Sequence, residues 1–361
     1  MKPLVVLNVV GLTPRLLAGY APNLNGMADR GFRATIEPVL PAVTCPVQAT
    51  YLTGLLPRDH GIVANGWYHR ETAEIRFWLQ ANSLVTGEKV WEAGRRRDPA
   101  FTCAQLFWWF NMYSTADWTV TPRPAYPADG RKIPDIYTQP ADLRSELLGA
   151  LGPFPLFKFW GPGAGLASSQ WITAAAVHLF GSRRPVLTLV YLPHLDYDLQ
   201  RYGPGGPDAA RALAAIDDVC GPLVETARAL GAEVMVLSEY GISAATAPVH
   251  VNRVLREEGL LAVHHNAVGE LLDAGASRAF AVADHQAAHV YVRDPGDVGR
   301  VRETLERVAG VGEVLDRTGQ ARLGLDHARS GELVLLAAPG RWFTYYYWLD
   351  DDRAPDFART V

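Results

Sequence analysis

The chain of 361 residues is 48% hydrophobic and 20% charged, so it is long enough to bury a core in one large domain or two smaller ones. Its formal net charge of -4 and its pI near 6.2 give no overall basic field, which argues against a nucleic-acid polymer or an anionic membrane as the partner. An odd number of cysteines without metal-type spacing argues against a disulfide framework or a zinc knuckle; these are Cys45, Cys103 and Cys220.

The amino-terminal segment MKPLVVLNVVG predicts a buried strand over residues 4–10. Its apolar run is short and is interrupted by Asn8, which distinguishes it from a secretory signal. No later segment approaches the roughly 18 to 20 uninterrupted apolar residues of a membrane span. We therefore expect a cytoplasmic protein without a membrane partner.

Residues 41–65, PAVTCPVQATYLTGLLPRDHGIVAN, predict a short helix whose start lies beside a hydroxyl group. Pro46 suits the first helical position, and Gly54 suits a stop about two turns later. The unpaired N–H groups and the positive dipole end of such a helix favour an anion beside Thr44, and a phosphoryl group is the obvious one. Cys45 is a rival nucleophile; the alternative is a small residue that caps the helix.

The chain from residue 111 to residue 165 is rich in Pro, Gly and aromatic residues, which predicts an irregular lid or cap. Its basic residues are candidates for contacting an anionic substrate, with solvated surface charge as the alternative. An aromatic cluster just before it is a candidate for stacking on a flat ligand group, with core packing as the alternative. The candidates are the basic residues Arg123, Arg131 and Lys132 and the aromatic residues Trp108, Trp109 and Phe110.

Further apolar runs at residues 186–192 and 234–237 predict buried strands, and apolar residues at helical spacing predict a helix within 213–230. This alternation indicates an α/β fold with a mostly parallel central sheet flanked by helices. The expected division is an α/β core at 1–110 and 166–262, a cap at 111–165, a small α/β subdomain at 263–340, and a C-terminal segment at 341–361 that ends abruptly, as a truncated chain would.

Candidate site residues follow several of these apolar runs. Thr44, Asp196 and Glu239 each do so, and ligands of parallel sheets lie beyond the carboxyl ends of the strands. In the segment ADHQAAHVYV, two histidines lie close to Asp284. His285 and His289 are capable of binding metal, and structural histidines are the alternative.

Residues 41–65 resemble the nucleophile segment of the alkaline phosphatase superfamily, and are most similar to that of its nucleotide pyrophosphatase/phosphodiesterase family. The resemblance implies an alkaline-phosphatase-like fold. It also implies that Thr44 is the nucleophile and that Asn65 donates to the phosphoryl oxygens. The matching residues are Thr44, Pro46, Thr53, Gly54, Pro57, His60, Gly61, Ile62 and Asn65.

The resemblance also implies two zinc ions, and several of the ligand positions are substituted here. Asp196 matches, Glu239 replaces Asp, Gln200 and Tyr240 replace His, and Val10 replaces the Asp that closes the first strand, with Asn8 two residues before it. No His follows His327, so the last family ligand is absent. A zinc pair is therefore not expected, and an oxygen-rich site around Asp196 and Glu239 suits one divalent ion such as magnesium, manganese or calcium.

Three hypotheses follow from this pattern. The first is a hydrolase or transferase that acts on a phosphate ester or anhydride of a small molecule through Thr44. The second is a binding or scaffold protein that kept the fold and lost the metals. The third is a metal-independent enzyme with Glu239 or His285 as base and Tyr240 as donor. The sequence does not predict an oligomeric state.

Overall fold

The computed structural model describes residues 1–360, and the chain divides into two compact units that we describe one at a time. The first unit contains Met1–Pro38, Gln80–Leu84 and Glu88–Ser243, and the second contains Val39–Leu79, Val85–Gly87 and the chain from Ala244 onward. The domain boundaries expected from the sequence stay a prediction. The compact units differ from them chiefly in grouping residues 39–79 with the C-terminal part of the chain.

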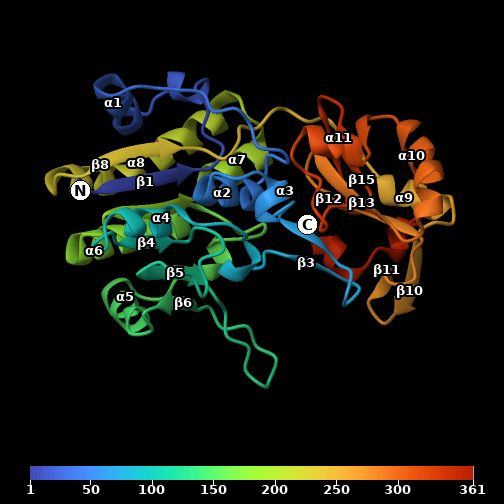
Figure 1. Ribbon diagram of the computed structural model, residues 1–361, viewed down its shortest axis with the longest axis horizontal. Helices are drawn as coiled ribbons and strands as arrows, with labels where there is room; N and C mark the ends of the chain where they lie inside the picture. Colours follow the sequence, from blue (N-terminus) through green and yellow to red (C-terminus); the bar gives the residue numbers. More distant parts are fainter. Residues whose placement is uncertain (361) are drawn as a thin grey trace. The chain divides into compact units, whose positions relative to one another are not determined.

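The first unit is built around a six-stranded sheet in the order β6-β5-β4-β7-β1-β8 (Figure 1). All neighbouring strands are parallel except β6, which is antiparallel to β5. The mostly parallel α/β fold is thus confirmed. The strands are β1 (Leu4–Val9), β4 (Cys103–Leu106), β5 (Trp118–Pro122), β6 (Ile136–Gln139), β7 (Leu187–Leu192) and β8 (Glu233–Leu237).

Two long helices cover this sheet. Helix α6 packs on β7, helix α8 packs on β1 and β8, and the two helices contact each other. Every residue of β7 and nearly every residue of β1 is buried, as their continuous apolar sequences predict. The helices of the unit are α1 (Pro22–Arg30), α4 (Val90–Arg97), α5 (Leu143–Leu151), α6 (Leu166–Arg183), α7 (His194–Tyr202) and α8 (Gly206–Ala229).

The expected irregular cap at 111–165 is more regular than its composition indicates. Strands β5 and β6 come from this range and extend the central sheet, and helix α5 follows them. The β-branched residues Thr119, Val120 and Thr121 are buried in β5, which explains why this stretch forms a strand despite the neighbouring prolines. The loop between β5 and β6 remains irregular and extends away from the sheet (Figure 1).

The second unit contains a four-stranded antiparallel sheet in the order β12-β13-β15-β14. Two hairpins and one short parallel pair accompany it: β2 with β3, β10 with β11, and β9 with β16. The strands are β2 (Gly66–His69), β3 (Glu74–Phe77), β9 (Ala247–Val249), β10 (Ala262–Asn266), β11 (Gly269–Asp273), β12 (Ala279–Asp284), β13 (Ala287–Val292), β14 (Val311–Leu315), β15 (Leu333–Ala337) and β16 (Arg341–Phe343).

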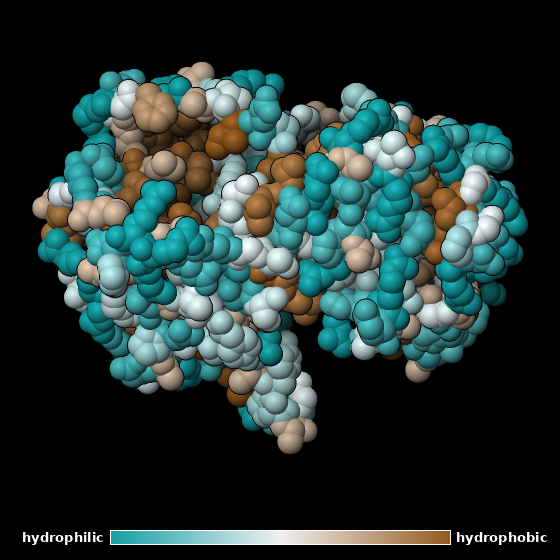
Figure 2. All heavy atoms as spheres, in the orientation of Figure 1, coloured by the Kyte–Doolittle hydropathy of each residue, from teal (hydrophilic) through white to brown (hydrophobic). Residues whose placement is uncertain are grey.

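Helix α9 packs on β12 and helix α10 packs on β14, so this unit is also a mixture of helices and sheet. Its helices are α2 (Thr44–Thr53), α3 (Pro57–His60), α9 (Val251–Glu257), α10 (Val298–Glu306) and α11 (Arg317–Arg322). In the space-filling view, hydrophilic side chains cover most of the visible face and hydrophobic ones gather in smaller patches (Figure 2). Within residues 1–360, no helix combines the length and apolar character needed to cross a lipid bilayer.

Helix α2 begins two residues earlier than the sequence predicts. Val43 is the extended N-cap residue, with φ -134° and ψ 160°, and Thr44 is already helical. Pro46 is tolerated in the first turn because N–H groups there have no partner within the helix. The predicted stop is correct, since Gly54 adopts the left-handed conformation with φ 70°.

His60 shows what the P-x-x-H-G-I part of the motif does in the fold. It is fully buried, and its Nδ1 accepts the N–H of Ile62 at 3.1 Å, so its Nε2–H donates to Thr50 Oγ1 at 3.0 Å. The imidazole thereby ties α3 and the chain after it to α2. Burial, followed by the positive charges of His327 and Arg329, lowers the pKa of His60 to about 4.

We predict that this buried imidazole makes stability depend on pH. Because the pKa of His60 is about 4 in the fold and 6.5 when unfolded, its contribution is complete above pH 6.5 and is lost as the pH falls toward 4. Between pH 7 and pH 4 the free energy of unfolding should fall by about 3 kcal/mol from this group. Urea unfolding of His60→Gln should show a shallower pH dependence, whereas the exposed His264→Gln should follow the wild type. Parallel curves for His60→Gln and wild type would refute this role.

Candidate active site

The predicted nucleophile in the second unit is a buried hydroxyl at the start of α2. Thr44 is 3% exposed and is the first residue of α2. Helix starts present backbone N–H groups and positive dipole charge, which favour an anion. The neighbouring Cys45 is also buried and forms no disulfide, so its burial agrees with the structural alternative for this residue.

Asn65 lies against the same helix start. Its Oδ1 accepts the backbone N–H of Cys45 at 2.9 Å, so this carboxamide satisfies one of the N–H groups of the first turn. The side chain is 3% exposed, and its backbone carbonyl accepts from Trp78 N at 3.0 Å. The structure therefore brings Thr44 and Asn65 together, two residues that the motif pairs.

A buried carboxylate at the end of β12 holds Asn65. Asp284 Oδ2 accepts the backbone N–H of Asn65 at 2.7 Å, and its Oδ1 accepts Asn65 Nδ2 at 3.1 Å. Burial raises the pKa of the Asp284 carboxyl, while His285 and the two N–H groups of Asn65 oppose this shift. Both oxygens of Asp284 thus serve as hydrogen-bond acceptors for one residue.

The two histidines after Asp284 have different surroundings. His285 is half-exposed, and its Nε2 lies 4.0 Å from Asp284 Oδ1. His289 is fully buried, where Nδ1 accepts from Gly331 N at 3.2 Å and Nε2–H donates to Val63 O at 3.1 Å. Burial lowers the pKa of His289 to about 4. Because the backbone uses both ring nitrogens, His289 has no lone pair for a metal, and we do not retain it as a ligand.

In the first unit, β1 pairs with both β7 and β8, so the carboxyl ends of these strands are adjacent. Asn8 is fully buried, and its Nδ2 donates to Glu239 Oε1 at 2.6 Å. Val10 is buried at the end of β1, where the family pattern has Asp. The side-chain amide of Asn8 thus donates to the carboxylate of Glu239.

Asp196, in the first turn of α7, is held in a similar way. Gln200 lies one turn later on α7, and its Nε2 donates to Asp196 Oδ2 at 2.7 Å. The phenol of Tyr240 donates to Asp196 Oδ1 at 3.3 Å. Nearby, His194 Nε2 lies 3.2 Å from Asp198 Oδ2, which agrees with a structural role for these two residues.

This donor set does not fit the two-zinc site that the resemblance implies. The oxygens of Asp196 and Glu239 accept hydrogen bonds from two amides and a phenol, none of which is a good zinc ligand. No group of three or more His, Cys, Asp or Glu side chains placed to hold a metal ion occurs within residues 1–360. We therefore derive no reaction step through zinc.

The other residues predicted to contact substrate are two buried tryptophans and one exposed arginine. Trp108 and Trp109 are 1% and 2% exposed, which favours the core-packing alternative, and Trp109 meets Trp160 edge to face with centroids 5.9 Å apart. Arg123 is exposed, and its Nη1 donates to Gln80 Oε1 at 3.3 Å. Neither arrangement identifies a ligand.

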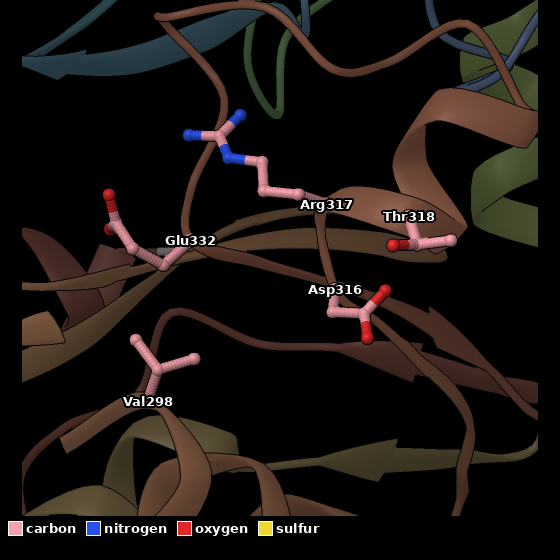
Figure 3. Close-up of a pocket in the computed structure, with 5 residues that line it drawn as sticks. All are labelled: Val298, Asp316, Arg317, Thr318 and Glu332. Carbon is pink, nitrogen blue, oxygen red and sulfur yellow. The ribbon is translucent and has the colours of Figure 1, made fainter. Parts of the chain in front are cut away.

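A separate pocket of about 290 Å³ lies in the second unit (Figure 3). Its charged side chains already have partners. Arg317 donates to His327 O at 2.9 Å, Asp316 accepts Gly319 N at 2.9 Å, and Glu332 pairs with Arg70 at 2.7 Å. None of the residues that line it was a predicted site residue: Val298, Asp316, Arg317, Thr318 and Glu332.

Sequence reasoning missed two pairings in these clusters. It mentioned Asp284 only as an acid close to His285 and His289, whereas in the fold this carboxylate accepts two hydrogen bonds from Asn65. It noted Asn8 only as the polar residue two positions before Val10, whereas in the fold Asn8 donates to Glu239. A signal for both pairings was present in the sequence: Asn8 lies within an apolar strand and Asp284 ends one. Buried polar groups need hydrogen-bond partners, so each of these side chains could have been expected to have one.

The fold of the chain is similar to that of two solved structures. Phosphonoacetate hydrolase from Sinorhizobium meliloti superposes with a TM-score of 0.69 at 19% identity, covering 98% of this chain and 84% of that one. Murine ectonucleotide pyrophosphatase/phosphodiesterase 5, solved as an inactive variant with AMP, gives a TM-score of 0.65 at 13% identity, covering 98% and 82%. At these identities the likeness shows the fold.

The family model for type I phosphodiesterase / nucleotide pyrophosphatase matches residues 4–359, so the chain belongs to this family. An uncharacterized pyrophosphatase/phosphodiesterase of Schizosaccharomyces pombe is 25% identical over 251 residues, covering 66% of this chain and 44% of its own length. Ectonucleotide pyrophosphatase/phosphodiesterase family member 3 of Bos taurus is 24% identical over 231 residues, covering 62% and 22%. The chain thus spans less than half the length of these curated relatives.

We predict that the amide of Asn8 stabilises the fold through Glu239. Asn8→Leu removes the donor and leaves a buried carboxylate oxygen with one partner fewer, which should lower the free energy of unfolding by about 2 kcal/mol. The matched control is Asn111→Leu, since Asn111 is equally buried but donates to a neutral acceptor, the carbonyl of Val120, at 3.0 Å. Urea unfolding should show the larger loss for Asn8→Leu; an equal or smaller loss would contradict this account.

Proposed function

We propose that this chain is a hydrolase of phosphate esters or anhydrides of small molecules, with Thr44 as the nucleophile. The observation that supports this most directly is the position of Thr44, which is the first residue of α2 and lies next to Cys45, whose backbone N–H is accepted by the Asn65 carboxamide at 2.9 Å. A helix start with a hydroxyl and a positioned carboxamide beside it suits a phosphoryl group. Family membership supports the same reaction class.

In the proposed reaction, Thr44 Oγ1 forms a bond to phosphorus while the bond from phosphorus to the leaving-group oxygen breaks. The free N–H of the Asn65 carboxamide and the positive end of α2 stabilise the negative charge that develops on the phosphoryl oxygens. Water then displaces Thr44 and releases the phosphorylated product. We propose Glu239 as the base and Tyr240 as a proton donor, two roles that belong to the metal-independent hypothesis.

We propose substrates of the size of a nucleotide, because a related structure contains AMP and another related enzyme is named for a small phosphonate. The donor set of Asp196 and Glu239 favours either no metal or one hard divalent ion over a zinc pair. A second candidate is a binding protein, which the replacement of family ligands by Val10, Gln200 and Tyr240 favours.

We predict that Thr44→Ala lowers the turnover of an activated phosphodiester such as bis(p-nitrophenyl) phosphate by about 1,000-fold or more, because the attacking oxygen is lost. Thr44→Ser should keep part of the activity. The matched control is Thr53→Ala at the other end of α2, where Thr53 Oγ1 donates to Ala49 O at 2.7 Å. Undiminished turnover in Thr44→Ala, or an equal loss in Thr53→Ala, would exclude Thr44 as the nucleophile.

We also predict that purified protein contains less than one equivalent of zinc and keeps most of its activity when a zinc-selective chelator is added in the presence of magnesium, since Asn8, Gln200 and Tyr240 donate to the carboxylates of Glu239 and Asp196. Under the same conditions Glu239→Gln should lose most of the activity if Glu239 is the base. Elemental analysis and steady-state kinetics give both results. Two tightly bound zinc ions whose removal abolishes turnover would contradict the proposal, and no turnover in any state would favour the binding protein.

A further inference from the structure

The carboxamide of Asn65 has a defined orientation because its partners have opposite character. Its Oδ1 faces a donor, Cys45 N at 2.9 Å, and its Nδ2 faces an acceptor, Asp284 Oδ1 at 3.1 Å. A flipped carboxamide would place two donors together on one side and two acceptors together on the other. The second N–H of Nδ2 is not used by Asp284 Oδ1 and remains for a ligand.

We propose that Asp284 is a positioning residue: its buried carboxylate holds the Asn65 carboxamide so that the remaining Nδ2–H is fixed for a phosphoryl oxygen at the start of α2. This inference rests on the proposed function. Asp284 binds both the backbone and the side chain of Asn65, at 2.7 Å and 3.1 Å, so the two bonds fix the side-chain torsion as well as the position. An oxyanion donor contributes most when its position is fixed before the reaction.

The fold holds Asp284 itself firmly. It is the last residue of β12 and pairs with Ala287 across the two-residue turn His285–Gln286. The turn is tied down on both sides, because Phe343 N donates to His285 O at 2.8 Å and Ala337 N donates to Gln286 O at 2.9 Å. A carboxylate on an anchored hairpin is suited to holding another side chain in place.

The same strand offers a matched control. Asn252 on α9 holds β12 through two bonds to Ala281, from Nδ2 to the carbonyl at 2.8 Å and from the Ala281 N–H to Oδ1 at 2.7 Å. Asn252 is 1% exposed and contacts neither Thr44 nor Asn65 through these bonds. Asn252→Ala therefore weakens the attachment of β12 without touching the carboxamide.

The test compares Asp284→Asn with Asn252→Ala in the turnover of bis(p-nitrophenyl) phosphate and in inhibition by inorganic phosphate. In Asp284→Asn one N–H of Asn65 faces an NH2 group, so the carboxamide loses its fixed orientation. We expect kcat to fall about 100-fold and the inhibition constant of phosphate to rise about tenfold, while Asn252→Ala keeps both values near wild type. Wild-type kcat in folded Asp284→Asn, or an equal loss of kcat in Asn252→Ala, would overturn the proposal.

A double variant guards against an effect on folding alone. In Asn65→Asp with Asp284→Asn, the Asn at position 284 can donate to the new carboxylate and accept the backbone N–H of residue 65, so the pair keeps its hydrogen bonds. We expect the melting temperature to recover relative to Asp284→Asn and kcat to stay low, because no N–H then faces the phosphoryl oxygen. Recovery of kcat in the double variant would overturn the proposal.

One further readout separates this inference from the proposed function. If wild-type protein neither hydrolyses the diester nor binds phosphate, the proposed function fails. The side-chain amide signals of Asn65 in protein labelled with nitrogen-15 asparagine, identified by their loss in Asn65→Asp, still report on the pairing. They should shift in Asp284→Asn and remain in place in Asn252→Ala; unchanged signals in Asp284→Asn would overturn the positioning role by themselves.

Discussion

The pairing of Asn65 with Asp284 is the interaction on which the account of this protein depends. A carboxylate removed from water is costly unless donors satisfy it, and here one residue supplies two N–H groups to the same carboxylate. The third contact, from Cys45 N to Asn65 Oδ1, extends the pairing to the start of α2. The end of β12 and the helix that presents Thr44 are thus joined by three directional bonds, and a displacement of either element strains the other.

Buried carboxylates of the first unit also accept hydrogen bonds, from a different set of donors. Glu239 and Asp196 are buried carboxylates that accept hydrogen bonds from Asn8, Gln200 and Tyr240. In each case a neutral side chain donates to the carboxylate. These hydrogen bonds offset part of the cost of removing the two carboxylates from water.

The sequence predicts the parts of the fold that depend on local patterns. Continuous apolar runs identify β1, β7 and β8, and Gly54 marks the end of α2. The predicted burial of 234–237 is wrong, because β8 is an edge strand of the sheet and Met235 is 47% exposed. The sequence does not predict contacts between residues that are far apart along the chain. Asn65 and Asp284 are 219 positions apart, so their pairing follows from the register of β12 and not from spacing. Similarly, only the fold shows that backbone groups hydrogen-bond to both ring nitrogens of His289. The pairing of β5 with β4, which extends the central sheet, is also visible only in the structure.

The central claim is that Thr44 attacks phosphorus, and the most direct measurement is the identification of the covalent intermediate. Wild-type protein mixed with an activated phosphodiester is quenched in acid within its first turnover, digested, and analysed by tandem mass spectrometry. The account predicts a phosphoryl ester on the hydroxyl of Thr44. A phosphoryl group found instead on Cys45, or on any residue outside the start of α2, would contradict it.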